Sequence, residues 1–243
     1  MPDLSIALPS VALEETFRRI VDPDGKLPAA LQALGPVVDR DVVVLDRGGG
    51  RLAGRLADMG ARVASFEFPL SDAASAELAG WVGRAEAVVV PWSEMAVPGS
   101  RFVAEASALL RPGGRLLVIH DYGRDDVWAL RPEIRERVVD WSQRKGPFLG
   151  AGFRIRVIHS WWTFDSIEQA RELLGTIFGD AGLEVAGRMR RPRLEYSIAI
   201  YHRDAPGVSG EPADGGSAGE AAGVGASALE ASAAEGLVPS GAR

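Results

Sequence analysis

The chain has 243 residues, is 47% hydrophobic and contains no cysteine, so it can bury a sizeable core but offers no disulfide, thiolate nucleophile or thiolate metal site. It has no apolar run long enough to span a membrane, and no basic region followed by an apolar one at its start, so we expect a cytoplasmic protein with no membrane partner. Six acidic residues and one arginine in residues 204–243 account for most of the net charge of −6. The remaining body is nearly neutral, which disfavours nucleic-acid binding.

Two helices are predicted before the first strand: Ser10 caps one, and Pro28 opens another that ends at Gly35. Strands and helices then alternate. The predicted order is a strand at 42–46, a helix, a strand ending at Glu67, a helix from Ser71, a strand at 85–92, a helix from Ser100 and a strand at 115–119. This alternation predicts an α/β fold with a mostly parallel sheet covered by helices on both faces.

The pattern changes after the last of these strands. The predicted elements are a helix at 125–144, a half-exposed strand at 153–159, a helix from Ser166 to about Phe178, and strands at 183–189 and 195–202. We therefore expect N-terminal helices in residues 1–40 and an α/β domain in residues 41–203, with residues 121–163 as an insertion or lid. Residues 204–243 are rich in glycine, alanine and serine and are predicted to be a disordered tail.

The segment VVVLDRGGGRLAGRLADMGARVASFE, residues 42–67, carries the clearest functional signal. Gly48, Gly49 and Gly50 let the backbone approach a ligand that any Cβ would exclude, and the helix behind them presents unpaired N–H groups. Asp46 closes the first strand. Glu67 closes the second, where an acid typically accepts hydrogen bonds from ribose hydroxyls. The segment predicts a cradle for a nucleotide-type cofactor.

The chain resembles the class I S-adenosylmethionine-dependent methyltransferases from about residue 30 to residue 203. The passages that carry the likeness are VVVLDRGGGRLA at 42–53, LLRPGGRLLVIHDY at 109–122 and IFGDAGLEVAGRMRRPRLEYSIAIYH at 177–202, which is similar to that family's terminal antiparallel hairpin. The resemblance implies a Rossmann-like methyltransferase fold and S-adenosylmethionine as cofactor. It further implies that Asp46 holds the amino group of the cofactor, that Gly48 and Gly50 line its backbone, and that Glu67 binds the ribose.

Only about twenty residues separate Glu67 from the next apolar strand, which leaves room for one helix. The strand that the family usually has there is therefore expected to be missing, with the Glu67 strand at the edge of the sheet. The glycine loop is also about two residues shorter than the family pattern. Both features keep open an alternative, a methyltransferase-like binding or scaffold protein without turnover.

A nicotinamide dinucleotide is another alternative for the cradle, since Gly48, Gly50 and Ala53 fit G-x-G-x-x-A. Asp46 argues against it, because a carboxylate two residues before the first glycine would repel phosphates and suits a cationic amino-acid group better.

Ligands of open parallel sheets lie beyond the carboxyl ends of the strands, so the residues just after each strand are the candidates for chemistry. Pro91 and Trp92 follow one strand and are predicted to contact cofactor; His120, Asp121 and Tyr122 follow the next. Methyl transfer needs alignment of the reactants and, for a hydroxyl acceptor, a general base. His120 is the preferred base, with Asp121 as its partner or substitute. A buried structural histidine is the competing interpretation.

The acceptor is expected to be a small molecule. Its pocket is predicted to be walled by Tyr122, His159, Trp161 and Trp162, although core packing is the alternative for the tryptophans and His159. The three histidines are far apart in sequence and no metal site is expected. The one concentrated basic cluster consists of Arg188, Arg190, Arg191 and Arg193, and we interpret it as a solvated turn rather than a phosphate-binding surface.

Overall fold

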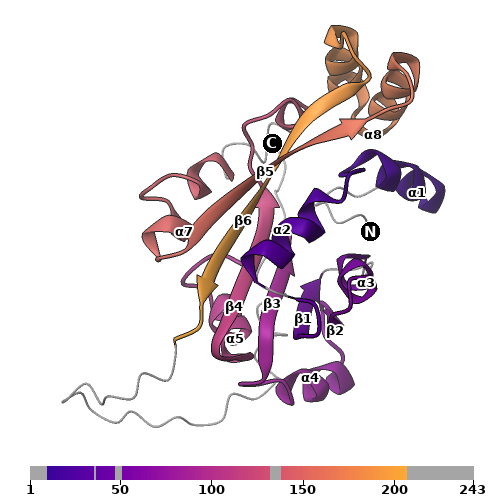
Figure 1. Cartoon of the computed structure of the whole chain (residues 1–243). Helices are drawn as coiled ribbons and strands as arrows, with labels where there is room; N and C mark the ends of the chain where they lie inside the picture. Colours follow the sequence, from indigo (N-terminus) through magenta and orange to yellow (C-terminus); the bar gives the residue numbers. More distant parts are fainter. Residues whose placement is uncertain (1–9, 36, 47–50, 132–137, 207–243) are drawn as a thin grey trace, which may run out of the picture.

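The computed structural model describes residues 10–35, 37–46, 51–131 and 138–206, and contains a six-stranded sheet in the order β2-β1-β3-β4-β6-β5 (Figure 1). The strands are β1 (Asp41–Asp46), β2 (Arg62–Glu67), β3 (Ala85–Pro91), β4 (Leu110–Asp121), β5 (Arg154–Thr163) and β6 (Arg193–Asp204). Strands β1 to β4 are mutually parallel, while β6 is antiparallel to both β4 and β5. The valine-rich β1 and β3 lie inside the sheet and are buried on both faces, as expected for parallel strands.

Helices cover both faces of this sheet (Figure 1). They are α1 (Val11–Ile20), α2 (Lys26–Leu34), α3 (Arg51–Asp58), α4 (Asp72–Ala79), α5 (Arg101–Ala108), the 3-10 helix η1 (Val127–Leu130), α7 (Pro147–Gly150) and α8 (Ile167–Arg188). One hydrophobic cluster joins α1, α2, α3 and α8 to the sheet, and a second joins α4, α5 and α7 to the opposite face. The predicted fold class, a mostly parallel α/β sheet with antiparallel C-terminal strands, is confirmed.

The caps expected from the sequence are present. The Oγ atoms of Ser10, Ser71, Ser100 and Ser166 each accept a hydrogen bond from the backbone N–H three residues later, which satisfies one of the unpaired donors of the helix that follows.

Strand β2 forms one edge of the sheet, as predicted from the short stretch between Glu67 and β3. A single helix, α4, lies between the two strands in sequence. The sheet therefore ends at the strand that carries Glu67.

One predicted element is wrong and another is interrupted. Residues 183–188 form the last turns of α8 and not a strand, because Val185 and Ala186 are both buried and Glu184 and Arg188 pair at helical spacing. The antiparallel partner of β6 is β5 instead. The predicted helix at 125–144 is present in part: η1 covers Val127–Leu130 and residues 138–141 are helical, while residues 132–137 lie outside the described residues. Arg131, the residue after η1, has a φ of −142° and ends this first helical segment. The following residue is proline, which disfavours the helical conformation of the residue before it.

The Arg-Pro-Gly-Gly motif lies within β4 rather than in a turn before it. The register between β3 and β4 shifts there, and Gly113 has a φ of +74°. A Cβ on Gly114 would lie 2.9 Å from the Ala85 carbonyl oxygen. The glycines thus allow an irregular first half of β4 to lie close against β3.

Helix α8 consists of two arms joined at Gly179, which has a φ of +58°. The arms cross closely at Gly182, where a Cβ would clash with the Leu174 carbonyl.

We expect Gly182→Ala to lower the free energy of unfolding by about 1–3 kcal/mol, because the added methyl group overpacks this crossing. Gly187 lies in the same helix with no atom near its Cβ position, so Gly187→Ala should raise stability by about 0.5–1 kcal/mol. Urea unfolding followed by circular dichroism measures the free energy of unfolding of both variants. Equal changes in the two variants would contradict the close crossing of the two arms.

Candidate active site

The candidate site lies at the carboxyl ends of the parallel strands. Asp46 and Glu67 are register partners at the ends of β1 and β2, so their side chains extend from the same face of the sheet. Asp46 is 9% exposed and Glu67 is exposed. Gly48, Gly49 and Gly50, which follow β1 in the sequence, lie outside the described residues.

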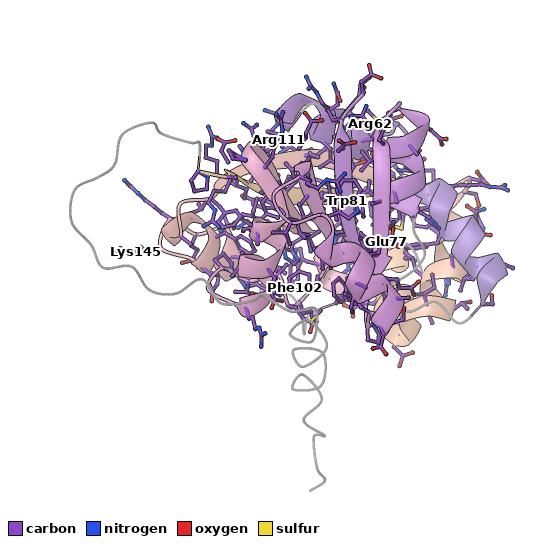
Figure 2. All side chains as sticks on the ribbon, turned by 90° about the horizontal axis from the view of Figure 1, so that it is seen from below. Arg62, Glu77, Trp81, Phe102, Arg111 and Lys145 are labelled. Atoms are coloured by element: carbon purple, nitrogen blue, oxygen red, sulfur yellow. The ribbon has the colours of Figure 1, made fainter. Side chains whose placement is uncertain are left out.

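At the amino ends of the strands, the carboxylates of Asp41 and Glu86 are held in ion pairs with arginine. Asp41 accepts a hydrogen bond from Arg62 at 2.7 Å, and Glu86 accepts from Arg111 at 2.7 Å. Figure 2 views the molecule from this side, with Arg62 and Arg111 labelled. The Arg62 guanidinium also holds the pKa of Asp41 below its usual value.

Strand β4 continues through His120 and Asp121, and its alternation places the two residues on opposite faces. Leu117 and Ile119 pack in the same hydrophobic cluster as Val42 and Val44 of β1, so Asp121 shares its face with Asp46 and Glu67. His120 faces the other cluster. The two residues predicted to act together are therefore separated by the sheet.

The Asp121 carboxylate joins three elements. It accepts hydrogen bonds from Trp92 Nε1 at 3.0 Å, from the Tyr196 hydroxyl at 2.7 Å and from the Arg131 guanidinium at 3.1 Å. Burial, together with the charge of Asp121, raises the pKa of Tyr196 well above its usual value. Tyr196 therefore stays protonated and donates to Asp121. This network fixes the end of β4 against the residue that follows β3 and against β6.

Asp125 lies next to this network and is 8% exposed. Its carboxylate accepts hydrogen bonds from three backbone N–H groups, those of Val127 at 3.1 Å, Trp128 at 3.3 Å and Ser197 at 2.7 Å. Burial raises the pKa of Asp125 to about 7 against the opposing effect of these donors, and the nearby Asp121 charge adds to the rise. A carboxyl group that titrates near neutral pH suits proton transfer.

His120 is 4% exposed within an aromatic cluster, with its ring centroid 4.4 Å from that of Trp141 and 5.7 Å from that of Phe148. Its Nε2 has no hydrogen-bond partner among the described residues. Burial lowers the pKa of His120 to about 3, so the imidazole is neutral at pH 7. These surroundings match the structural interpretation of His120 and not a base facing a ligand.

Because the folded-state pKa of His120 lies below its ordinary value of 6.5, the unfolded chain binds more protons below pH 6.5 and stability falls as the pH drops. We expect wild type to lose about 2 kcal/mol of unfolding free energy relative to His120→Phe between pH 7 and pH 5. Denaturant titrations of both proteins at the two pH values measure this difference. A constant difference between the two proteins would show that His120 is not held neutral.

The remaining predicted pocket residues do not form one wall. Trp162 is fully buried, with its ring 4.7 Å from Phe17 in an edge-to-face contact, and belongs to the core. Trp161 projects from the opposite face of β5, where the Arg193 guanidinium lies 4.2 Å from its ring. His159 is largely exposed, 3.0 Å from the Ser197 hydroxyl.

Tyr122 is partly buried and lies against the Arg124 guanidinium, 5.4 Å from its ring. Pro91 ends β3 and is buried, as is Trp92, which follows it. The structure therefore brings Trp92 and Asp121 together but separates both from His120, His159 and Trp161.

Two cavities adjoin the Asp121 network. The smaller, of about 20 Å³, is lined by residues that include Asp121, Asp125, Arg131 and Tyr196. The larger, of about 540 Å³, shares Asp125 and Trp128 with it and extends toward the end of α8. Asp125, Arg131 and Tyr196 were not among the site residues predicted from the sequence. The one available signal was that Asp125 follows a predicted strand by only a few residues.

Within the described residues, no group of three or more His, Asp or Glu side chains could hold a metal ion. No helix in that part of the chain is long and apolar enough to cross a membrane.

No protein-family model matches the sequence, and no curated protein matches it. Among solved structures, the chain is similar to a SAM-dependent methyltransferase from Thiobacillus denitrificans in complex with S-adenosyl-L-homocysteine, with 16% identity over 81% of this chain and 99% of that one and a TM-score of 0.44. It is also similar to a geranyl diphosphate methyltransferase in complex with SAM, with 19% identity over 74% of this chain and 84% of that one and a TM-score of 0.41. At such identities, ligands and activity have to be inferred from the residues of this chain itself.

Proposed function

We propose that this protein binds S-adenosylmethionine at the carboxyl ends of β1 and β2 and transfers its methyl group to a small-molecule acceptor. The observation that carries the proposal is the pairing of Asp46 with Glu67 at the ends of adjacent parallel strands, on the same face as Asp121. The cofactor has a cationic amino group and two ribose hydroxyls, all of them hydrogen-bond donors. Two carboxylates are chemically suited to accept from them.

In this proposal Asp46 accepts from the amino group and Glu67 from the ribose. Glu67 is exposed and has no hydrogen-bond or ion-pair partner in the described part of the chain, so its carboxylate is available to a ligand. Gly48, Gly49 and Gly50 are proposed to line the cofactor, and Pro91 and Trp92 to contact it. When bound, S-adenosylmethionine supplies an electrophilic methyl group on a sulfonium.

The residues around Asp125 are proposed to serve the acceptor. Asp125 lines the larger cavity and, with a pKa of about 7, can accept a proton from an acceptor hydroxyl. Asp121 positions this region through Trp92, Tyr196 and Arg131. We therefore assign the role of base to Asp125 in preference to His120, which does not line this cavity and is enclosed in an aromatic cluster.

A binding protein without turnover is the second candidate, and the edge position of β2 favours it. Because the described residues contain no further strand beyond β2, fewer main-chain and side-chain groups border the place where Glu67 would hold a ribose. Weak or absent cofactor binding would distinguish this candidate from the enzyme.

Calorimetric titration of the full chain with S-adenosylhomocysteine tests the proposal. We expect one site per chain with a micromolar dissociation constant, and no heat with NADH under the same conditions. Absence of heat at millimolar S-adenosylhomocysteine would reject the methyltransferase and leave the binding protein.

A further inference from the structure

We propose that the larger cavity binds an anionic small molecule with an apolar body, and that this molecule is the methyl acceptor; the second part rests on the proposed function. The cavity, of about 540 Å³, lies between the segment after β4, the end of α8 and the start of β6. Four arginines line it: Arg188, Arg190, Arg191 and Arg193. These residues were predicted to form a solvated turn, but in the structure they border a cavity.

Three of the four arginines that line the cavity are available to bind an anionic ligand. Arg188 lies 3.5 Å from Glu184, whereas Arg190, Arg191 and Arg193 form no ion pair within the described residues. The two acidic residues of the lining each accept hydrogen bonds from backbone N–H groups. Asp126 accepts from Glu195 N at 3.0 Å, and Asp125 accepts from the three N–H groups described above.

Guanidinium groups without a protein carboxylate are suited to bind a phosphate or carboxylate ligand, since each presents several N–H donors in a planar fork. The Arg193 guanidinium stacks 4.2 Å from the Trp161 ring, which holds it in place beside the cavity. The turn thus supplies three cationic donors to one side of the cavity.

The other lining residues are mostly apolar. They are Trp128, Ala129, Trp161, Val185, Met189 and Leu194. A cavity with an apolar wall and a cationic rim matches a compact molecule with an apolar part and one acidic group. It matches a nucleic acid less well, because the body of the chain is nearly neutral and offers no extended basic surface.

The position of the cavity connects the anion to the proposed chemistry. Asp125 and Trp128 line both this cavity and the smaller one that contains Asp121 and Tyr196. A ligand held by the arginines therefore occupies a cavity whose wall also contains Asp125. The arginines would select the acceptor by its charge, and Asp125 would face its reacting hydroxyl.

Phenyl phosphate is a suitable probe, with benzoate as the carboxylate counterpart and phenol as the uncharged control. Binding to the full chain without cofactor is followed by calorimetry and by tryptophan fluorescence, because Trp128 and Trp161 line the cavity. We expect phenyl phosphate or benzoate to bind at least tenfold more tightly than phenol. Whichever of the two binds more tightly identifies the acidic group.

Arg190→Gln/Arg191→Gln should weaken the binding of the tighter anion at least tenfold. Both residues are exposed and neither stacks on a tryptophan, so the variant should fold. Arg144→Gln/Arg156→Gln removes the same charge from exposed positions outside the cavity and should change binding less than twofold.

Three results would overturn the inference: equal binding of phenol and the anions, equal losses in the two double variants, or tighter binding of a 12-nucleotide RNA than of either anion. The last result would assign the arginines to a nucleic-acid surface. Because the probes are titrated without S-adenosylhomocysteine, their binding is separate from the cofactor test. Anion binding without cofactor binding would sustain the site and reject only its assignment to a methyl acceptor.

Discussion

Asp46→Asn is expected to weaken the binding of S-adenosylhomocysteine by roughly 10- to 100-fold. The substitution keeps the size of the side chain but removes the negative charge, and a hydrogen bond between charged groups contributes about 1.5–3 kcal/mol. Asp46 is largely buried at the end of β1, where such an interaction is weakly screened by solvent. Calorimetric titration of the variant and the wild type measures the ratio of the two dissociation constants.

Asp41→Asn is the matched control, because Asp41 lies at the amino end of the strand that Asp46 ends. It removes an exposed ion pair with Arg62, which contributes little to stability, so binding should change less than twofold. If the two variants bind equally well, the amino group of the ligand is not held at Asp46.

Asp121→Ala is expected to lower the free energy of unfolding by about 3–5 kcal/mol. The substitution leaves the largely buried Arg131 guanidinium without this carboxylate, and it removes the acceptor of Trp92 Nε1 and of the Tyr196 hydroxyl. Chemical denaturation followed by tryptophan fluorescence provides the measurement.

Asp204→Ala is the comparison for a paired carboxylate in a more exposed place. Asp204 binds Arg115 and Arg154 near the end of β6, where the side chain is 44% exposed, so its loss should cost less than about 1 kcal/mol. Comparable losses in the two variants would contradict the structural role given to Asp121.

The parallel half of the fold could be predicted because its determinants are local. Runs of valine in β1 and β3 predict buried strands, and serine caps mark the helices between them. In the antiparallel half, the strands predicted at 153–159 and 195–202 are present as β5 and β6, but their pairing with each other was not predicted. Residues 183–189 have a short apolar pattern compatible with strand or helix, and were predicted to be the partner strand instead. Their conformation is decided by contact between the two arms of α8, at Gly182 and Leu174.

Part of the candidate site could be predicted, because some of its residues are placed by the ends of the strands. The positions of Asp46 and Glu67 follow from strand ends alone, and the structure places them side by side. His120 and Asp121 were treated as residues after a strand, whereas β4 continues through both and its alternation sends their side chains to opposite faces. The role of Asp125 depends on Ser197, 72 residues away in sequence, and no local pattern indicates that contact.

A crystal structure of the full chain grown with S-adenosylhomocysteine tests the central claim most directly. The ligand should lie at the carboxyl ends of β1 and β2, with its amino group within hydrogen-bond distance of Asp46 and its ribose hydroxyls on Glu67. Two results would contradict the assignment of these strand ends as a cofactor site. One is a ligand bound elsewhere, and the other is an empty site at millimolar ligand with the Asp46 carboxylate covered by protein side chains.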